Sequence, residues 1–115
     1  MATESPLTPL SMAILVALGG GDLHGYALLR QVEERSGGLL CPGTGSLYAA
    51  LQRLMDEGLI VESPERPEDD DDARRRYYRI TADGRAAVAV EAGRVEELLA
   101  DARRYGLIPA REGRG

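Results

Sequence analysis

The chain of 115 residues is long enough for one compact domain with an appendage and too short for two independent domains. Its formal charge of -5 disfavours loose attraction of nucleic acid to the whole surface, so any contact with DNA must come from locally concentrated arginines. A single cysteine, Cys41, and a single histidine, His24, exclude an internal disulfide framework and a Cys/His zinc site, and we expect no metal or other cofactor.

The sequence also lacks the signals of membrane insertion and export. No stretch reaches the roughly 18 consecutive apolar residues of a membrane span, and the N-terminus lacks the basic and then apolar pattern of a secretory signal. We therefore expect a cytoplasmic protein that does not bind membranes. All 14 basic residues are arginine, which is typical of a GC-rich bacterial genome.

Two short helices are predicted in the first third of the chain. Thr8 caps the first helix, Pro9 takes its first position, and three consecutive glycines end it. Either Asp22 or His24 caps the second helix, which a Ser-Gly-Gly run ends at residues 36–38. Neither helix is long enough to be stable alone, so both must pack into a shared core.

The helix predicted over residues 44–57 has two different faces. Its apolar stripe, at helical spacing, consists of Leu47, Leu51, Leu54 and Met55. The opposite face has small and hydrogen-bonding side chains: Gly45, Ser46, Ala49, Gln52, Arg53 and Asp56. Such a face can approach a surface closely, and Gln and Arg are types that read base edges or hold phosphates. We interpret it as a DNA recognition helix; the alternative is an ordinary amphipathic helix with a solvated face.

A β-hairpin follows this helix. Residues 59–61 and 76–81 have strand patterns and should pair antiparallel. The acidic run at 68–72 lies between them and predicts a solvated loop. Three helices and a hairpin in this order describe a mainly α fold with a small β-hairpin, the winged helix-turn-helix, which we assign to residues 7–81.

A long final helix is predicted over residues 82–106, with Thr81 as its cap. Apolar side chains repeat there at alternating steps of four and three, at Val88, Ala92, Val95, Leu99 and Ala102. The helix exceeds what so small a domain needs for its own core, so we expect it to pair with a second copy. The alternative is a helix folded back on its own domain. Residues 1–6 and 109–115 are expected to be flexible tails.

In its motifs the sequence resembles the PadR family of bacterial transcriptional regulators. The motifs are Leu23-His24-Gly25-Tyr26, Gly45-Ser46-Leu47-Tyr48, Glu57-Gly58-Leu59-Ile60 and Arg76-Tyr77-Tyr78-Arg79-Ile80-Thr81. Each is weak alone, but their order and spacing are fairly specific. The resemblance implies a homodimer held by the C-terminal helix that binds double-stranded DNA at a palindromic operator. It also implies regulation, as a repressor, with release by a small, aromatic effector at the dimer interface.

The resemblance also implies which side chains contact DNA and which form the dimer. The DNA-binding residues would be Gly45, Ser46, Tyr48, Ala49, Gln52 and Arg53 of the recognition helix, Tyr26 of the second helix, and Arg74, Arg75, Arg76 and Arg79 of the wing. Both tyrosines either pack or contact the DNA backbone, and the arginines either bind DNA or neutralise the acidic run. The dimer interface would comprise Val88, Ala92, Val95, Leu99, Ala102, Tyr105, Leu10 and Ile14.

Two features depart from what a DNA-binding wing and an effector site would need. The acidic run should repel DNA at the wing tip, and the chain has neither Trp nor Phe to stack on a flat effector. Enzymatic activity is not expected, because the Gly19-Gly20-Gly21 run lacks the following Lys of a phosphate-binding loop. The alternative function is a winged-helix module that binds a partner protein and not DNA.

Overall fold

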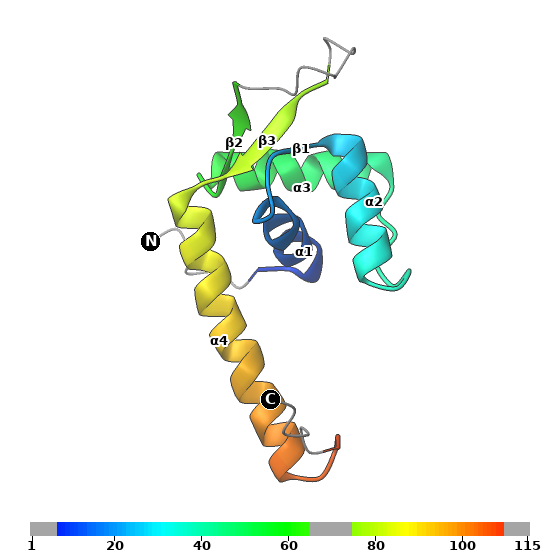
Figure 1. Ribbon diagram of the computed structural model, residues 1–115, viewed down its shortest axis with the longest axis vertical. Coiled ribbons are helices and arrows are strands. Elements are labelled where there is room, and N and C mark those ends of the chain that lie inside the picture. The colour runs from blue at the N-terminus through cyan, green and yellow to red at the C-terminus, as the bar shows by residue number, and fades with distance from the viewer. Residues whose placement is uncertain (1–6, 65–74, 110–115) are drawn as a thin grey trace.

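The structure, a computed structural model, describes residues 7–64 and 75–109. In chain order these residues form α1 (Pro9–Leu18), β1 (Leu23–His24), α2 (Gly25–Arg35), α3 (Thr44–Asp56), β2 (Ile60–Ser63), β3 (Tyr77–Ile80) and α4 (Ala82–Arg104). Helix α1 lies at the centre and contacts α2, α3, α4 and β3 (Figure 1). The predicted acidic loop, Arg74, residues 1–6 and all of the C-terminal tail except Pro109 lie outside the described residues.

Side-chain caps set the starts of three helices. Thr8, His24 and Thr81 precede α1, α2 and α4, and each accepts a hydrogen bond from the backbone N–H three residues later, at 3.0, 3.2 and 3.0 Å. Of the two caps considered for α2, the structure therefore uses His24. Helix α3 ends just before Gly58, whose φ of 78° lies in the left-handed region that glycine adopts readily.

The sheet has three strands, so the prediction of a two-stranded hairpin was incomplete. Strand β3 lies between β1 and β2 and pairs antiparallel with both. Leu23 of β1 lies opposite Tyr78, and Ile60 of β2 lies opposite Ile80. Strand β1 is too short to show the alternation that identifies a strand in a sequence. It joins the wing, formed by β2 and β3, to the chain between α1 and α2.

The core cluster is aliphatic except for Tyr78 from the wing; Tyr77 is also buried but lies outside this cluster. The largest fully buried side chains of the cluster are Ile14, Leu15, Leu18, Leu28, Val32, Leu47, Leu51, Leu54, Leu59 and Ile60. Ile14, which we placed at a dimer interface, is 0% exposed here, because it faces its own domain from the middle of α1. It therefore has no surface to offer a second copy. Leu10, from the same set, is partly buried against this core.

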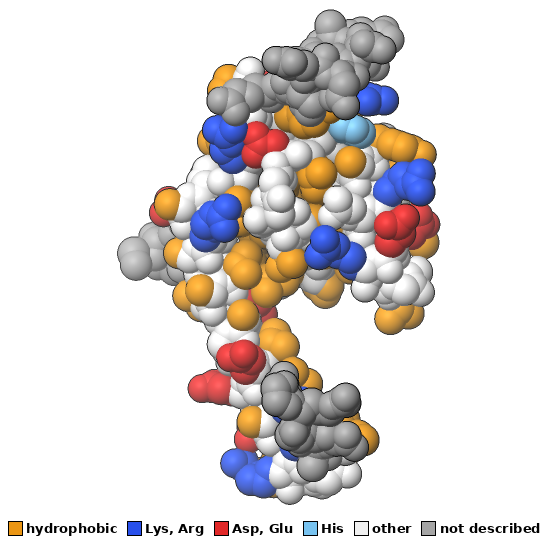
Figure 2. Space-filling view, viewed as in Figure 1, with side chains coloured by type: hydrophobic (Ala, Val, Ile, Leu, Met, Phe, Trp, Pro, Cys, Tyr) orange, Lys and Arg blue, Asp and Glu red, His pale blue; other side chains and the backbone are white. Residues whose placement is uncertain are grey.

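Helix α4 starts on the domain and then leaves it (Figure 1). Its buried residues, Gly84 and Ala87, lie in its first two turns, and Val88 packs partly against the core. Farther along, Val95 and Leu99 are 42% and 41% exposed. Figure 2 shows hydrophobic side chains continuing along this projecting rod. The distal half of α4 therefore does not fold back on its own domain. Of the helices in the described ranges, none is both long and apolar enough to cross a membrane.

Candidate nucleic-acid interface

The face of α3 that points away from the core is open along its length. Its exposed residues are Gly45, Ser46, Ala49, Gln52, Arg53 and Asp56, while Leu47, Ala50, Leu51 and Leu54 hold the other side in the core. The central part of the outer face thus consists of small or hydrogen-bonding side chains. A helix with such a face can approach a groove closely.

Gln52 is oriented by its neighbour on this face. Its side-chain Nε2 donates a hydrogen bond to Oδ1 of Asp56, one turn later, at 3.0 Å. Exposed pairs at this spacing stabilise a helix by only about 0.2–0.5 kcal/mol. The amide of Gln52 is therefore directed along the helix in the free protein, yet little free energy opposes its transfer to a base edge.

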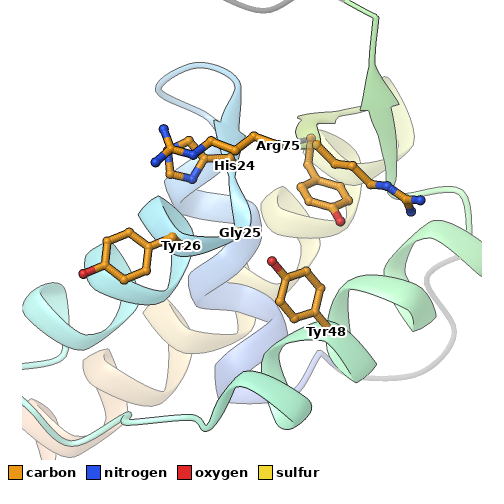
Figure 3. Close-up of a pocket in the computed structure, with 7 residues that line it drawn as sticks. His24, Gly25, Tyr26, Tyr48 and Arg75 are labelled. Atoms are coloured by element: carbon orange, nitrogen blue, oxygen red, sulfur yellow. The ribbon is translucent and has the colours of Figure 1, made fainter. Parts of the chain in front are cut away.

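A pocket of about 410 Å³ lies beside α3, where α2 and β3 begin (Figure 3). The residues that line it are His24, Gly25, Tyr26, Tyr48, Arg75, Arg76 and Tyr78. Four of the predicted site residues, from three separate segments, meet here: Tyr26, Tyr48, Arg75 and Arg76. Guanidinium groups beside tyrosine hydroxyls are the donors that bind phosphate oxygens. The sequence did not indicate that these residues share a pocket, because their meeting depends on tertiary packing.

Tyr48 packs against α2 and also lines the pocket, while its contact with the DNA backbone stays a prediction. Its ring rises from α3 with the hydroxyl pointing toward Gly25, the first residue of α2 (Figure 3). A Cβ atom at Gly25 would overlap this hydroxyl and lie 2.8 Å from Cζ of the ring. The side chain is nevertheless 46% exposed. The absence of a side chain at Gly25 is what lets α2 and α3 approach each other here.

Tyr26 points away from Tyr48 and is 60% exposed, so it does not pack in the core (Figure 3). The guanidinium carbon of Arg30 lies 5.9 Å from the centre of its ring, within cation–π range. This pair presents a hydroxyl and a positive charge at the side of the pocket.

Tyr78 forms the buried wall of the pocket and is 3% exposed. Burial is the main cause that raises the pKa of its hydroxyl above the usual value, with the nearby Tyr48 adding to it. The group therefore stays a neutral phenol at physiological pH. A neutral phenol can donate a hydrogen bond to an anion in the pocket.

Arg79, predicted as a DNA-binding residue of the wing, is held by a carboxylate instead. Its Nη2 donates to Oδ2 of Asp22 at 2.8 Å and its Nε to both carboxylate oxygens at 3.2 Å. The hydroxyl of Ser63 donates to the same Oδ2 at 2.7 Å. These hydrogen bonds, led by those from Arg79, lower the pKa of Asp22. Arg79 thus has a role within the fold, which sequence reasoning missed because its partner is 57 residues away.

Groups suited to metal binding are not assembled in the described ranges. No set of three His, Cys, Asp or Glu side chains there could hold a metal ion. The thiol of Cys41 is exposed and lies 3.0 Å from Oε2 of Glu33, and this hydrogen bond raises the pKa of the cysteine. A thiol held in its protonated form is a poor nucleophile.

Comparison with known sequences shows clear relatives. The model of the Transcriptional regulator PadR-like family matches residues 14–90. Transcriptional regulator Rv3488 of Mycobacterium tuberculosis is 41% identical over 85 residues, which are 74% of each chain. An uncharacterized 37.1 kDa protein in transposon TN4556 of Streptomyces fradiae is 40% identical over 81 residues, and the match spans 70% of this chain but 21% of that protein.

Solved structures share the same fold. A PadR family transcription regulator from Clostridium difficile superposes with a TM-score of 0.73 at 23% identity, over 85% of this chain and 98% of that one. Bacillus subtilis PadR, solved in complex with operator DNA, has a TM-score of 0.59 at 26% identity, over 71% and 45% of the two chains. From the family match and the Mycobacterium relative together, we conclude that this chain belongs to the PadR-like family of transcriptional regulators.

Proposed function

We propose that this protein is a sequence-specific DNA-binding transcriptional regulator that acts as a homodimer. The observation that carries the proposal is the open outer face of α3 next to a pocket lined by Arg75, Arg76 and tyrosine hydroxyls. The similar Bacillus subtilis PadR was solved with operator DNA, which supports the proposal. The net charge of -5 makes this local grouping of arginines necessary.

The two parts of the interface have different tasks in this proposal. Helix α3 enters the major groove, where Gln52 and Arg53 read base edges. The pocket beside it binds the phosphate backbone through Arg75, Arg76 and the hydroxyl of Tyr48, and so fixes the register of α3. Sequence preference then depends on α3, while the pocket supplies affinity that is independent of sequence.

Dimerisation through α4 is supported by its uncovered apolar side. Val88 packs partly against the core, Ala92 is half-buried, and the same side of the helix continues to Val95 and Leu99, which are exposed in the single chain. A second copy packed along this side would bury both. Two recognition helices must lie about 34–36 Å apart to enter successive major grooves, and a symmetric pair would select a palindromic operator.

We further propose that the dimer represses transcription from its operator and is released by a small aromatic effector. The family resemblance supports both points. An effector held between paired α4 helices could stack on Tyr105, which is 68% exposed near the end of the rod. Fluorescence titration of the tyrosines with planar aromatic carboxylic acids and drugs, with and without operator DNA, tests this part separately.

Selection of bound duplexes from a random pool, followed by gel shifts, tests DNA binding. We expect one enriched inverted repeat and salt-sensitive affinity. Gln52→Ala should weaken operator binding by about 1–3 kcal/mol and relax the base preference at one position of each half-site. Arg75→Ala should weaken binding to all DNA sequences equally and reduce the slope of log affinity against log salt concentration by about 1. Arg94→Ala, on α4, is the matched control and should change neither.

The opposite outcome is also clear. If no duplex is enriched even at low salt, the proposal fails. Purification of the protein with a stoichiometric partner protein and without enriched DNA would favour the alternative of a protein-binding winged helix.

A further inference from the structure

The carboxylate of Asp22 connects all three strands of the sheet. Asp22 directly precedes β1, and it accepts hydrogen bonds from Arg79 of β3 and from Ser63 at the end of β2. Ser63 is 8% exposed, and the side chains of Asp22 and Arg79 are 27% and 42% exposed. We call these three residues the Asp22 clamp.

The register of the sheet places the clamp on the side opposite the core. His24 pairs with Tyr77 and Leu23 with Tyr78, so the next position along this ladder sets Asp22 beside Arg79. On the same face, the rings of His24 and Tyr77 meet edge to face at 5.3 Å. Strand residues two apart share a face, so the clamp and this ring pair form one continuous outer layer.

The inner face of the wing packs in the core, and this outer layer adds a second attachment of the wing to the rest of the protein. The wing strands have four residues each, and a two-stranded hairpin of that size is marginally stable alone. Strand β1 adds only two paired residues to β3. Bidentate bonds between a guanidinium and a carboxylate fix orientation as well as distance. Together with the packing of Ile60, Tyr78 and Ile80 in the core, the clamp can therefore fix the angle at which the wing leaves the helical domain.

That angle matters for the site because Arg75 and Arg76 directly precede β3. We propose that Asp22 is a positioning residue for DNA binding, an inference that rests on the function proposed above. Through Arg79 and Ser63 it holds the wing so that Arg75 and Arg76 face the pocket beside α3. An acidic residue thereby strengthens binding to a polyanion, although its own charge repels that polyanion.

A double-mutant cycle tests the proposal. Asp22→Asn removes the charge but keeps the size, and we expect operator affinity to fall roughly three- to tenfold, as for the loss of one charge-assisted hydrogen bond. In a background that carries Arg75→Ala and Arg76→Ala, the same change should have almost no effect, because there is no wing cation left to position. Asp101→Asn is the matched control: it makes the same substitution in the exposed Asp101–Arg104 pair near the end of α4, away from the sheet and the pocket, and should leave affinity unchanged.

Hydrogen exchange supplies a test that needs no DNA. Asp22→Asn should speed exchange of the β2 and β3 amides at least severalfold while the α3 amides stay protected. Unchanged exchange in the wing would overturn the proposed positioning role of Asp22, whether or not the protein binds DNA.

Equal or higher operator affinity of Asp22→Asn would also overturn this role, because it would mean that Asp22 only keeps Arg79 from contacting DNA. Failure of the wild type to bind any duplex would instead contradict the proposed function, and the exchange result would still show whether Asp22 holds the wing in place.

Discussion

Gly25 matters because it has no side chain, which leaves room for the ring of Tyr48. Its Cα faces the hydroxyl of Tyr48, and the two helices of the pocket meet at this contact. Any larger residue must move either the tyrosine or α2. The tyrosine can move more easily because its hydroxyl is at the end of a side chain that is 46% exposed. The pocket and the packing of α2 on α3 therefore depend on the same pair of residues.

We predict that Gly25→Ala lowers the free energy of unfolding by about 1 kcal/mol, at the low end of the cost of overpacking, because the half-exposed Tyr48 can move aside. In a Tyr48→Ala background the sign should reverse, because alanine favours a helix over glycine by up to about 1 kcal/mol and nothing then opposes it. Urea unfolding of the four proteins measures this. Equal effects of Gly25→Ala in the two backgrounds would show that Tyr48 is not the obstacle.

The Asp22 clamp makes a prediction about pH. The hydrogen bonds from Arg79 lower the pKa of Asp22 from its usual value of 3.8, so the folded state binds this proton less readily than the unfolded state. The stabilisation is then present above a pH of about 4 and is lost as the pH falls through the lowered pKa. The difference in stability between wild type and Asp22→Asn, from thermal unfolding, should be constant near neutral pH and disappear in strong acid. A difference that is independent of pH would contradict this.

At the residue scale, the sequence predicted local roles well and distant ones poorly. The cap at His24 was one of two candidates because it lies next to the helix that it caps. The outer residues of α3 were predicted because helical spacing assigns them to one face. The partner of Arg79 and the neighbour of Gly25 could not be predicted, since both depend on contacts between segments far apart in the chain.

At the element scale, Thr81 joins the end of the α3 segment to the start of α4. Its Oγ1 caps α4 and also donates to the carbonyl of Gly58 at 2.7 Å, while its backbone N–H donates to the carbonyl of Leu59 at 3.0 Å. The segment that ends α3 and the first turn of α4 are thus joined by hydrogen bonds through one residue.

We predict that Thr81→Ala lowers the free energy of unfolding by about 1–2 kcal/mol, through loss of the cap and of the hydrogen bond to Gly58. Thr81→Ser keeps the hydroxyl and should stay within about 0.5 kcal/mol of the wild type. Chemical unfolding followed by circular dichroism distinguishes the two. If serine is as harmful as alanine, the methyl group and not the hydroxyl is responsible.

The helices and the strands differ in how well the sequence predicted them. The four helices were predicted nearly to the residue, since caps, a proline and glycines mark their ends. Strand β1 was missed because two residues carry no periodicity, and its pairing depends on where β3 lies. The acidic run of the wing lies outside the described residues, so its relation to DNA stays a prediction.

At the scale of the whole molecule, the projecting rod of α4 sets the expected assembly. We predict that Leu99→Asp gives a monomer by light scattering, because pairing would bury an unpaired charge, and that operator binding is lost with it. Ala86→Asp introduces the same charge on the exposed opposite side of α4 and should stay dimeric. A dimeric Leu99→Asp protein would show that the copies associate through another surface.

The joint at Thr81 has a mechanical consequence. Because the first turn of α4 is fixed to the segment that ends α3, the rod and the reading helix should turn together as a lever. In the proposed dimer, a small change in the crossing angle of the two α4 helices would then move the two α3 helices by a larger distance. Such a change would alter the separation of the α3 helices relative to the helical repeat of DNA without changing the structure of either winged-helix domain.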